Sequence, residues 1–302
     1  MIIRPETPSD YSDIANINVR AFDERADEAL IVSLSRHRST FDPDLSLIAE
    51  DGGQIVGHAL FSPLTIRLLG ESVRVVNLGP IAVDPNVQKK GIGAALIAEG
   101  HAVARAKGYS LSFLLGHPTY YPRFGYQRHA FGASRLTLHE HNLPTNDLDT
   151  RKPVEADLPV LHDLWLREEG GVDFSIDPGD QLIDWISPNP AITAQVYLRH
   201  EAIVGYTRIH RDEPYSPGVF FAADGEAARM MAWQIGGGKP VDLPLHPYSA
   251  SAAALGMPEA NAWEAAMVCS LIPGAFEDYF AQVEAGTRIP GRPIWPVAFE
   301  VA

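Results

Sequence analysis

The sequence predicts an α/β protein built from two tandem copies of one domain. Its 302 residues are about twice the length of a typical domain. Stretches rich in β-branched residues alternate with stretches whose apolar residues recur at helical spacing. Three short motifs of the first half also return, in the same order, in the second half. We therefore expect the fold to be duplicated within one chain.

The first repeated motif opens each half. The chain begins "IIRPETPSDYSDIANI", in which a short strand leads to Thr7-Pro8-Ser9-Asp10, a helix start, and then to apolar residues at helical spacing. The stretch "TRKPVEADLPVLHDLW" repeats this pattern near the midpoint of the chain. The matched pairs, each 147 positions apart, are Arg4 and Arg151, Asp10 and Asp157, Ile14 and Leu161, and Ile17 and Leu164.

The other two repeated motifs follow in order. The strand-like "QIVGHALFSP", from Gln54, returns as "AIVGYTRIHR", from Ala202. The dipeptide His117-Pro118 follows "YSLSFLLG", and His246-Pro247 follows "PVDLPL". Between these two motifs the second copy is shorter, and the segment that it lacks corresponds to a glycine-rich stretch of the first copy.

A polar, turn-rich stretch separates the copies. It reads "HNLPTNDLDT" and covers residues 141–150. The predicted domains are therefore residues 1–143 and 150–302.

In the first copy, "SVRVVNLGPIAVDP" is strand-like because β-branched residues recur along it. Gly79-Pro80 interrupts this segment, and a proline inside a strand usually marks an edge or a bulge. A bulge there would separate this strand from its neighbour and leave unpaired backbone amides facing the gap.

The next stretch, "VQKKGIGAALIAEG" from Val87 to Gly100, places glycines where a helix begins. Gly91 and Gly93 would let an anion approach the free N–H groups of the first turn, where the helix dipole favours negative charge. Lys89 and Lys90 add positive charge. The stretch therefore predicts a pyrophosphate site.

Other phosphate-binding loops fit less well. A dinucleotide fold would place the glycines after the first strand of a βαβ unit, with an acidic residue about 20 positions further on. Here the preceding strand is about the fourth. A Walker loop requires Gly-Lys-Ser/Thr, and Gly91 is followed by isoleucine. In the second half, the run Gly236-Gly237-Gly238-Lys239 precedes Pro240 and a strand, so it predicts a plain loop.

Residues Leu78 to Gly108 resemble the acetyl-CoA motif of the GCN5-related N-acetyltransferases (GNAT), whose signature is Q/R-x-x-G-x-G/A. The stretch Gln88-Lys89-Lys90-Gly91-Ile92-Gly93 matches each fixed position. Further on, "GHPTYYPRFGYQRH" resembles the Tyr-Tyr-x-Arg-Phe-Gly-Phe element that follows the fifth strand in many members, especially the small bacterial YhbS-like group. This direct resemblance covers residues 1 to about 140.

The resemblance implies two tandem GNAT-like domains, each a mixed, mostly antiparallel twisted sheet flanked by helices. The first would be the catalytic acetyl-CoA-binding domain, and the second a degenerate copy. Tandem copies with one degenerate half occur in this superfamily, which includes the Eis-like aminoglycoside acetyltransferases. The implied activity is transfer of an acetyl group from acetyl-CoA, the co-substrate, to an amine.

The resemblance also assigns roles to residues. The backbone amides of Ile81, Ala82 and Val83 would pair with the pantetheine arm and polarise the thioester carbonyl. Tyr121 would protonate the leaving thiolate, and Tyr120 would be the packing residue, although the order could be reversed. The pyrophosphate would be held by the amides of Gln88, Lys89, Lys90, Gly91, Ile92, Gly93 and Ala94.

The general base stays open. Some members carry a glutamate on the fourth strand, and alignment on Ile81-Ala82-Val83 places Asn77 there. Asparagine cannot take a proton, although it could hold a water that does. The other candidates are Glu50, Glu71, His58 and His117.

No metal is expected. His139-Glu140-His141 suggests one, but two histidines two positions apart on a strand lack a third ligand, and a solvated strand end is favoured.

Composition limits the partners and the compartment. A net charge of −14 argues against a nucleic-acid or anionic-membrane surface. It mildly favours cationic substrates, although an acidic surface also serves solubility. No apolar run approaches the roughly 20 residues of a membrane span, and "MIIRPETPSD" lacks a signal-peptide core. A single cysteine, Cys269, suits a reducing compartment, so we expect a cytoplasmic protein.

Two functions remain open. In the first, the protein acetylates a primary amine of a small molecule or peptide, and its second half walls the acceptor pocket or forms the interface of a homodimer. In the second, it is a non-catalytic module that senses acetyl-CoA. An intact Tyr121 beside an intact phosphate turn favours the enzyme. The acceptor pocket is expected from the first two helices, "FDERADEALIVSLSRHRS", from loops and from the second half.

Overall fold

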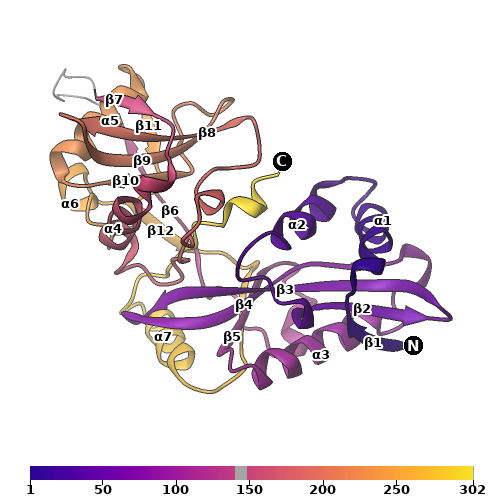
Figure 1. Ribbon diagram of the computed structural model, residues 1–302. Coiled ribbons are helices and arrows are strands. Elements are labelled where there is room, and N and C mark those ends of the chain that lie inside the picture. The colour runs from indigo at the N-terminus through magenta and orange to yellow at the C-terminus, as the bar shows by residue number, and fades with distance from the viewer. Residues whose placement is uncertain (140–147, 302) are drawn as a thin grey trace.

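The computed structural model in Figure 1 describes residues 1–139 and 148–301. The elements of the first half are β1 (Ile2–Pro5), α1 (Tyr11–Ala21), α2 (Asp27–Ser35), β2 (Ser46–Asp51), β3 (Gln54–Leu68), β4 (Glu71–Val83), α3 (Ile92–Ala106), β5 (Leu111–Leu115) and β6 (Gly132–Leu138). Those of the second half are β7 (Asp149–Arg151), α4 (Leu158–Glu169), β8 (Ile192–Arg199), β9 (Ala202–His210), β10 (Val219–Ala222), α5 (Gly225–Gly236), β11 (Val241–Leu243), α6 (Ala252–Leu255), β12 (Glu259–Ala262), β13 (Ala266–Ser270) and α7 (Ala275–Glu284).

The strands form mixed, mostly antiparallel sheets, as predicted. The largest has the order β1-β2-β3-β4-β5-β13, and within it β4 and β5 are parallel. The other two sheets have the orders β10-β9-β8-β7 and β11-β6-β12. Figure 1 shows two bodies side by side, with α1 and α2 over one face of the large sheet and α3 on the other. α7 packs against Val75 and Phe113, which point away from α3, so α7 lies on the face opposite α3.

The repeat in the sequence corresponds to a repeated structural unit. In the first half, Arg4 donates to Asp10 over 2.8 Å, and Asp10 also accepts the backbone N–H of Thr7 over 2.7 Å. In the second half, Arg151 donates to Asp157 over 2.6 Å, and Asp157 accepts the N–H of Val154 over 2.8 Å. The hydrogen bond from arginine lowers the pKa of each aspartate. Each half therefore begins with a strand arginine paired to a carboxylate that also accepts the backbone N–H at the start of the 3-10 turn, Pro8–Asp10 or Glu155–Asp157, leading into the first helix.

Two strands are exchanged between the halves. β13, from near the end of the chain, lies antiparallel to β5, with Cys269 opposite Ser112. β6, from the first half, lies between β11 and β12 of the second. The domain division at 143 and 150 stays a prediction, since residues 140–147 lie outside the described part. The sheets cross that division in both directions.

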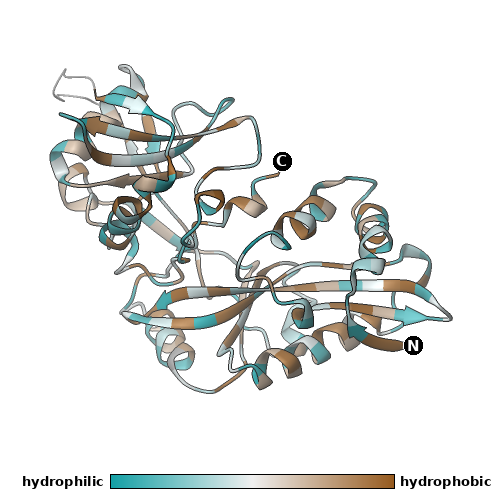
Figure 2. Ribbon diagram, in the orientation of Figure 1, coloured by the Kyte–Doolittle hydropathy of each residue, from teal (hydrophilic) through white to brown (hydrophobic). Residues whose placement is uncertain are grey.

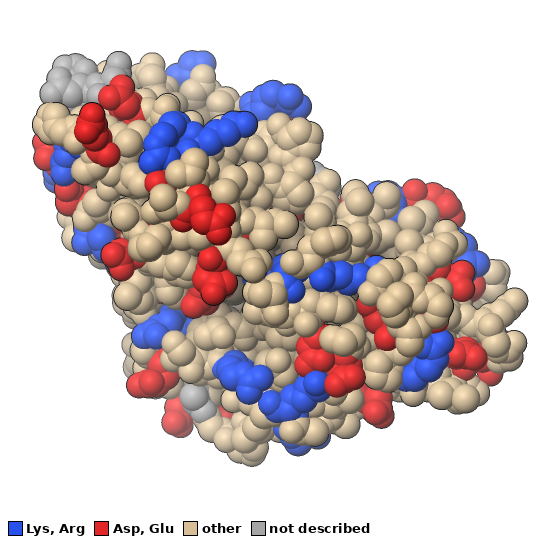
Figure 3. All heavy atoms as spheres, viewed as in Figure 1, with Lys and Arg blue, Asp and Glu red and all other residues tan. Residues whose placement is uncertain are grey.

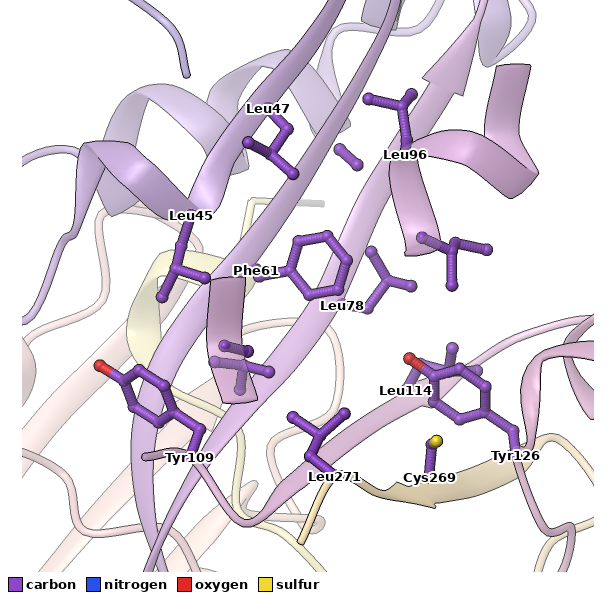
Figure 4. Packing of buried hydrophobic residues seen from close by; sticks show 14 of the residues in the cluster. Leu45, Leu47, Phe61, Leu78, Leu96, Tyr109, Leu114, Tyr126, Cys269 and Leu271 are labelled. Carbon is purple, nitrogen blue, oxygen red and sulfur yellow. The ribbon is translucent and has the colours of Figure 1, made fainter. Parts of the chain in front are cut away.

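The core of the first half lies between α3 and the large sheet. Figure 4 shows Phe61, Leu78, Leu96 and Leu114 meeting there, together with Cys269 from β13. Figure 2 shows that hydrophobic residues follow the long strands β3 and β4. α3 approaches the sheet closely because Gly100 lacks a side chain. A Cβ at that position would lie 2.0 Å from the Phe61 ring.

Within the described residues, no helix is long and apolar enough to cross a bilayer.

We expect Asp10→Ala and Asp157→Ala each to lower the free energy of unfolding by about 1–2 kcal/mol, because a helix start loses its cap and an arginine its partner. Urea denaturation measures this loss. Asp13→Ala, on the exposed side of α1, is the control and should cost less than about 0.5 kcal/mol. Equal losses in Asp10→Ala and Asp13→Ala would show that the repeated unit does not stabilise the fold.

Candidate active site

A fork between β4 and β5 forms the site. The two strands pair only where residues 75–77 lie beside residues 111–113, whereas β4 continues to Val83. Opposite the diverging part, the pairing of β3 with β4 shifts register between Ala59 and Phe61, so that β4 carries an extra residue at Gly79-Pro80, whose peptide bond is cis. The bulge predicted from Gly79-Pro80 is therefore present. The backbone of β4 beyond Asn77 faces a gap without a β5 partner.

The start of α3 borders this gap. Gly91 is the N-cap of α3, adopts a left-handed conformation with φ of 85°, and offers no side chain to the first turn. Ile92, Gly93 and Ala94 are the first helical residues, and their N–H groups have no partner within the helix. The helix therefore begins where the glycines predicted, with no side chain at its N-cap, while the pyrophosphate site itself stays a prediction.

A cavity of about 760 Å³ lies over this turn. Eight of the residues predicted to bind the cofactor line it: Ile81, Val83, Gln88, Lys89, Gly91, Ile92, Gly93 and Ala94. The side chains of Ala82, which is buried, and Lys90, which is exposed, do not. The roles predicted for these two residues involve their backbone amides.

Aromatic and basic side chains close the opposite wall of this smaller cavity. The hydroxyl of Tyr120 lies 2.8 Å from where a Cβ on Gly93 would be. The guanidinium of Arg123 lies 4.5 Å from the centre of the Tyr120 ring. A side chain at position 93 would therefore displace the Tyr120 hydroxyl and would also reduce access to the helix N–H groups. Arg123 adds a positive charge near an anion site, a contribution that the sequence analysis did not single out.

A second cavity, of about 1100 Å³, lies between the two halves. The first half contributes Phe22, Glu28 and Ile31, from α1, α2 and the turn between them. The sequence analysis expected this contribution, and also a wall from the second half. It did not single out residues 292–300, "RPIWPVAFE", although most of this segment lines the cavity. The only local signal is the density of prolines and aromatic residues in this segment.

The two cavities meet at Tyr121. Five residues line both of them: Ile81, Val83, Gln88, His117 and Tyr121. The Tyr121 ring packs over Gly116 and stands nearly perpendicular to that of Tyr120, with centroids 5.1 Å apart. The pKa of Tyr121 is raised to about 12, mainly by burial and to a smaller extent by the neighbouring Tyr120. The phenol is therefore protonated at neutral pH and can donate a hydrogen bond between the cavities.

The candidate bases lie at different places. Asn77 lines the larger cavity and is the last β4 residue paired to β5. His117 lines both cavities. Glu50, on β2, accepts a hydrogen bond from Arg4 of the neighbouring strand β1. Glu71 is exposed and is the first residue of β4. Neither glutamate lines either of these two cavities.

His58 is a structural residue. It is fully buried, with its ring nitrogens 3.0 Å from the Ser46 hydroxyl and 3.3 Å from the Asn18 side chain. Its pKa is lowered to about 3, mainly by burial and to a smaller extent by the charge of Arg36, so the imidazole is neutral. Since it lines neither cavity, it has no access to a substrate.

The second half closes the equivalent helix start with its own carboxylate. The N-cap of α5 is Asp224, which accepts the N–H of Ala227 over 2.7 Å and pairs with Arg199, also at 2.7 Å. Its glycine run lies at the other end of α5, where Gly237 is the C-cap. The prediction of a plain loop without a phosphate site is consistent with this arrangement. A negative charge occupies the position where α3 has Gly91.

Two expectations from the sequence concern the distribution of surface charge and the His139-Glu140-His141 motif. On the face in Figure 3, basic and acidic side chains are interspersed without a continuous basic patch. Of His139-Glu140-His141, the last two lie outside the described residues. In residues 1–139 and 148–301, no three His, Cys, Asp or Glu side chains gather in a way that could hold a metal ion.

Comparison with known proteins gives matches to both the first half and the whole chain. Residues 2–129 match the acetyltransferase (GNAT) domain family. The uncharacterized N-acetyltransferase YjhQ of Escherichia coli K12 is 40% identical over 119 residues, which cover 39% of this chain and 65% of YjhQ, slightly less than two thirds. The uncharacterized N-acetyltransferase YhbS of Escherichia coli K12 is 34% identical over 128 residues, which cover 42% of this chain and 74% of YhbS.

Two solved structures complete the comparison. Escherichia coli YhbS in complex with CoA is 33% identical, with a TM-score of 0.39 over 43% of this chain and 71% of that one. Eis1 from Mycobacterium abscessus is 16% identical, with a TM-score of 0.62 over 90% of this chain and 74% of that one. The likeness to Eis1 is one of fold, and it extends over both halves.

Proposed function

The chain belongs to the GNAT family of N-acetyltransferases, and from this we propose that it transfers the acetyl group of acetyl-CoA to a primary amine held in the cavity between its halves. The observation that carries the proposal is the position of Tyr121. This protonated phenol lies where a cavity over an open helix start meets a second cavity large enough for a small molecule.

Acetyl-CoA fits the smaller cavity by its chemistry. Its pyrophosphate would lie at the start of α3, where N–H groups without intrahelical partners and the helix dipole favour an anion. Its pantetheine arm carries amide groups that would pair with the β4 backbone at Ile81, Ala82 and Val83, on the side that β5 leaves open. This placement would bring the thioester to the fork, beside Tyr121.

The reaction would then be a direct attack on the thioester. The amine nitrogen forms a bond to the carbonyl carbon, and the bond from that carbon to sulfur breaks. Backbone N–H groups of β4 would stabilise the charge on the carbonyl oxygen. Tyr121 would donate a proton to the leaving sulfur. The proton lost by the amine would pass to a water held by Asn77, whose amide cannot accept it.

The test is to incubate the protein with acetyl-CoA and a panel of primary amines, and to follow release of the free thiol. We expect release that depends on an amine, with mass spectrometry identifying the amide product. Binding of acetyl-CoA without turnover across a broad panel would favour a module that senses acetyl-CoA.

A carboxylate at position 93 should abolish binding of the cofactor. Calorimetry should find one CoA per chain in the wild type, since Asp224 occupies the equivalent helix start of the second half. Gly93→Glu should weaken binding by about 100-fold or more, because it adds bulk beside Tyr120 and a like charge beside the pyrophosphate. Ala98→Glu, on the exposed side of α3, is the matched control. Unchanged affinity in a folded Gly93→Glu protein, or two sites per chain, would contradict the assignment.

Removing the Tyr121 hydroxyl should slow catalysis without weakening cofactor binding. Tyr121→Phe keeps the ring over Gly116 but removes the proton donor, so kcat should fall by about 10²-fold. The affinity for acetyl-CoA should be nearly unchanged, as for an interaction made only in the transition state. Tyr120→Phe should have a much smaller effect. If the two variants exchange behaviours, Tyr120 is the acid, and if neither is slow, the reaction uses another acid or none.

A further inference from the structure

The larger cavity carries an inference about the acceptor, and it rests on the proposed function. We infer that the acceptor is an amphipathic amine with an apolar or aromatic body and no carboxylate beside the amine. It binds Glu28 as a primary ammonium group and releases one proton to solvent water before the neutral nitrogen attacks the thioester. Three features of the cavity carry this inference, namely the pairing of its arginines, the incomplete pairing of Glu28, and the chemistry of its wall.

Each arginine that lines the larger cavity lies within 3.3 Å of a carboxylate oxygen, although Nε of Arg208 and Oε2 of Glu300 are buried without a hydrogen bond from the described residues. Since these guanidinium groups have carboxylate partners in the protein, they leave little uncompensated positive charge for an anionic substrate. The pairs are Arg292 with Glu169 at 2.8 Å, Arg135 with Asp242 at 3.2 Å, and Arg208 with Glu300 at 3.3 Å.

Glu28 is a half-buried carboxylate of the cavity without a close cationic partner. Its nearest cation among the described residues is Arg25, whose guanidinium is 3.8 Å away and whose side chain is 62% exposed. The second oxygen of Glu28, Oε2, is buried, and no hydrogen bond from the described residues reaches it. An ionised carboxylate withdrawn from water without a donor is costly, so an ammonium group that enters the cavity would bind there. Glu213, which is exposed and also lines the cavity, adds negative charge.

The rest of the wall is suited to an apolar body. Phe22 and Ile31 line it from the first half, and Ile294 and Phe299 from the second. Trp295 is held in place because its ring stacks on Phe113 of the core, with centroids 5.7 Å apart, and contacts Phe299 at 5.8 Å. A preformed wall of this kind favours a flat or branched hydrocarbon group.

An acceptor with a carboxylate next to its amine would be disfavoured. Binding its ammonium group at Glu28 would bring a second negative charge close to Glu28, whereas the arginines of the cavity are engaged with Glu169, Asp242 and Glu300. The cavity would therefore distinguish an amine from the corresponding amino acid by charge.

The test compares phenethylamine with phenylalanine, which share a skeleton and differ in one carboxylate. In the thiol-release assay we expect kcat/KM to be about tenfold or more higher for phenethylamine. Glu28→Gln should lower this value about tenfold, mainly by raising KM, because it removes the charge that binds ammonium. Asp27→Asn removes the same charge from the neighbouring residue of α2, which does not line the cavity, and should change little.

A binding measurement gives a readout that does not require turnover. Trp263 and Trp295 line the cavity, so phenethylamine should change the tryptophan fluorescence of the CoA-saturated protein. We expect Glu28→Gln, but not Asp27→Asn, to weaken this binding about tenfold. Preference for phenylalanine, or equal behaviour of the wild type and Glu28→Gln, would overturn this inference while leaving acetyl transfer intact. Failure of every amine to release thiol would instead overturn the proposed function, and the fluorescence result would still decide the ligand class.

Discussion

Backbone pairing between β4 and β5 ends after three residues, and the site depends on this early end. Beyond Asn77 the two strands diverge, which leaves β4 amides without a strand partner and opens a gap at one end of the large sheet. The start of α3 borders the gap from one side, and Tyr121, in the segment after β5, borders it from the other. The sheet remains whole because β4 is paired along β3 and β5 is paired along β13.

The two halves show what the fold requires and what the site requires. Both retain an arginine paired to a helix-capping aspartate, at Asp10 and at Asp157, because this unit stabilises each start. They differ at the helix that follows the fourth strand of each copy. Gly91 leaves the start of α3 open, whereas Asp224 closes the start of α5 with a negative charge. The two helix starts therefore differ at the N-cap: the proposed anion site at α3 has a glycine there, and α5 has a carboxylate.

Most of the first half could be predicted from sequence because its signals are local. The helix start at Asp10, the bulge at Gly79-Pro80 and the open turn at Gly91 each arise from residues a few positions apart. Tyr121 was identified from the resemblance to a family, and the structure places it between the cavities.

The unpredicted features depend on distant parts of the chain. A strand such as β6 has the same alternating pattern whichever sheet it joins, so the strand exchange leaves no local trace. The isolation of Glu28 becomes visible only once the arginines of the cavity are seen with their partners, which come from other elements. His58 was a candidate base because a histidine in a strand can be exposed or buried, and here packing buries it completely.

The exchange of β13 also sets an order for biosynthesis. The edge of β5 is complete only when residues 266–270 have been made, about 150 residues after β5 itself. At about 5–20 residues per second, a ribosome needs roughly 8 to 30 s for that stretch. During this interval the nascent first half carries an unpaired edge strand of apolar residues, which can associate with other chains. The first half of the protein thus reaches its final form only after residues 266–270 have been made.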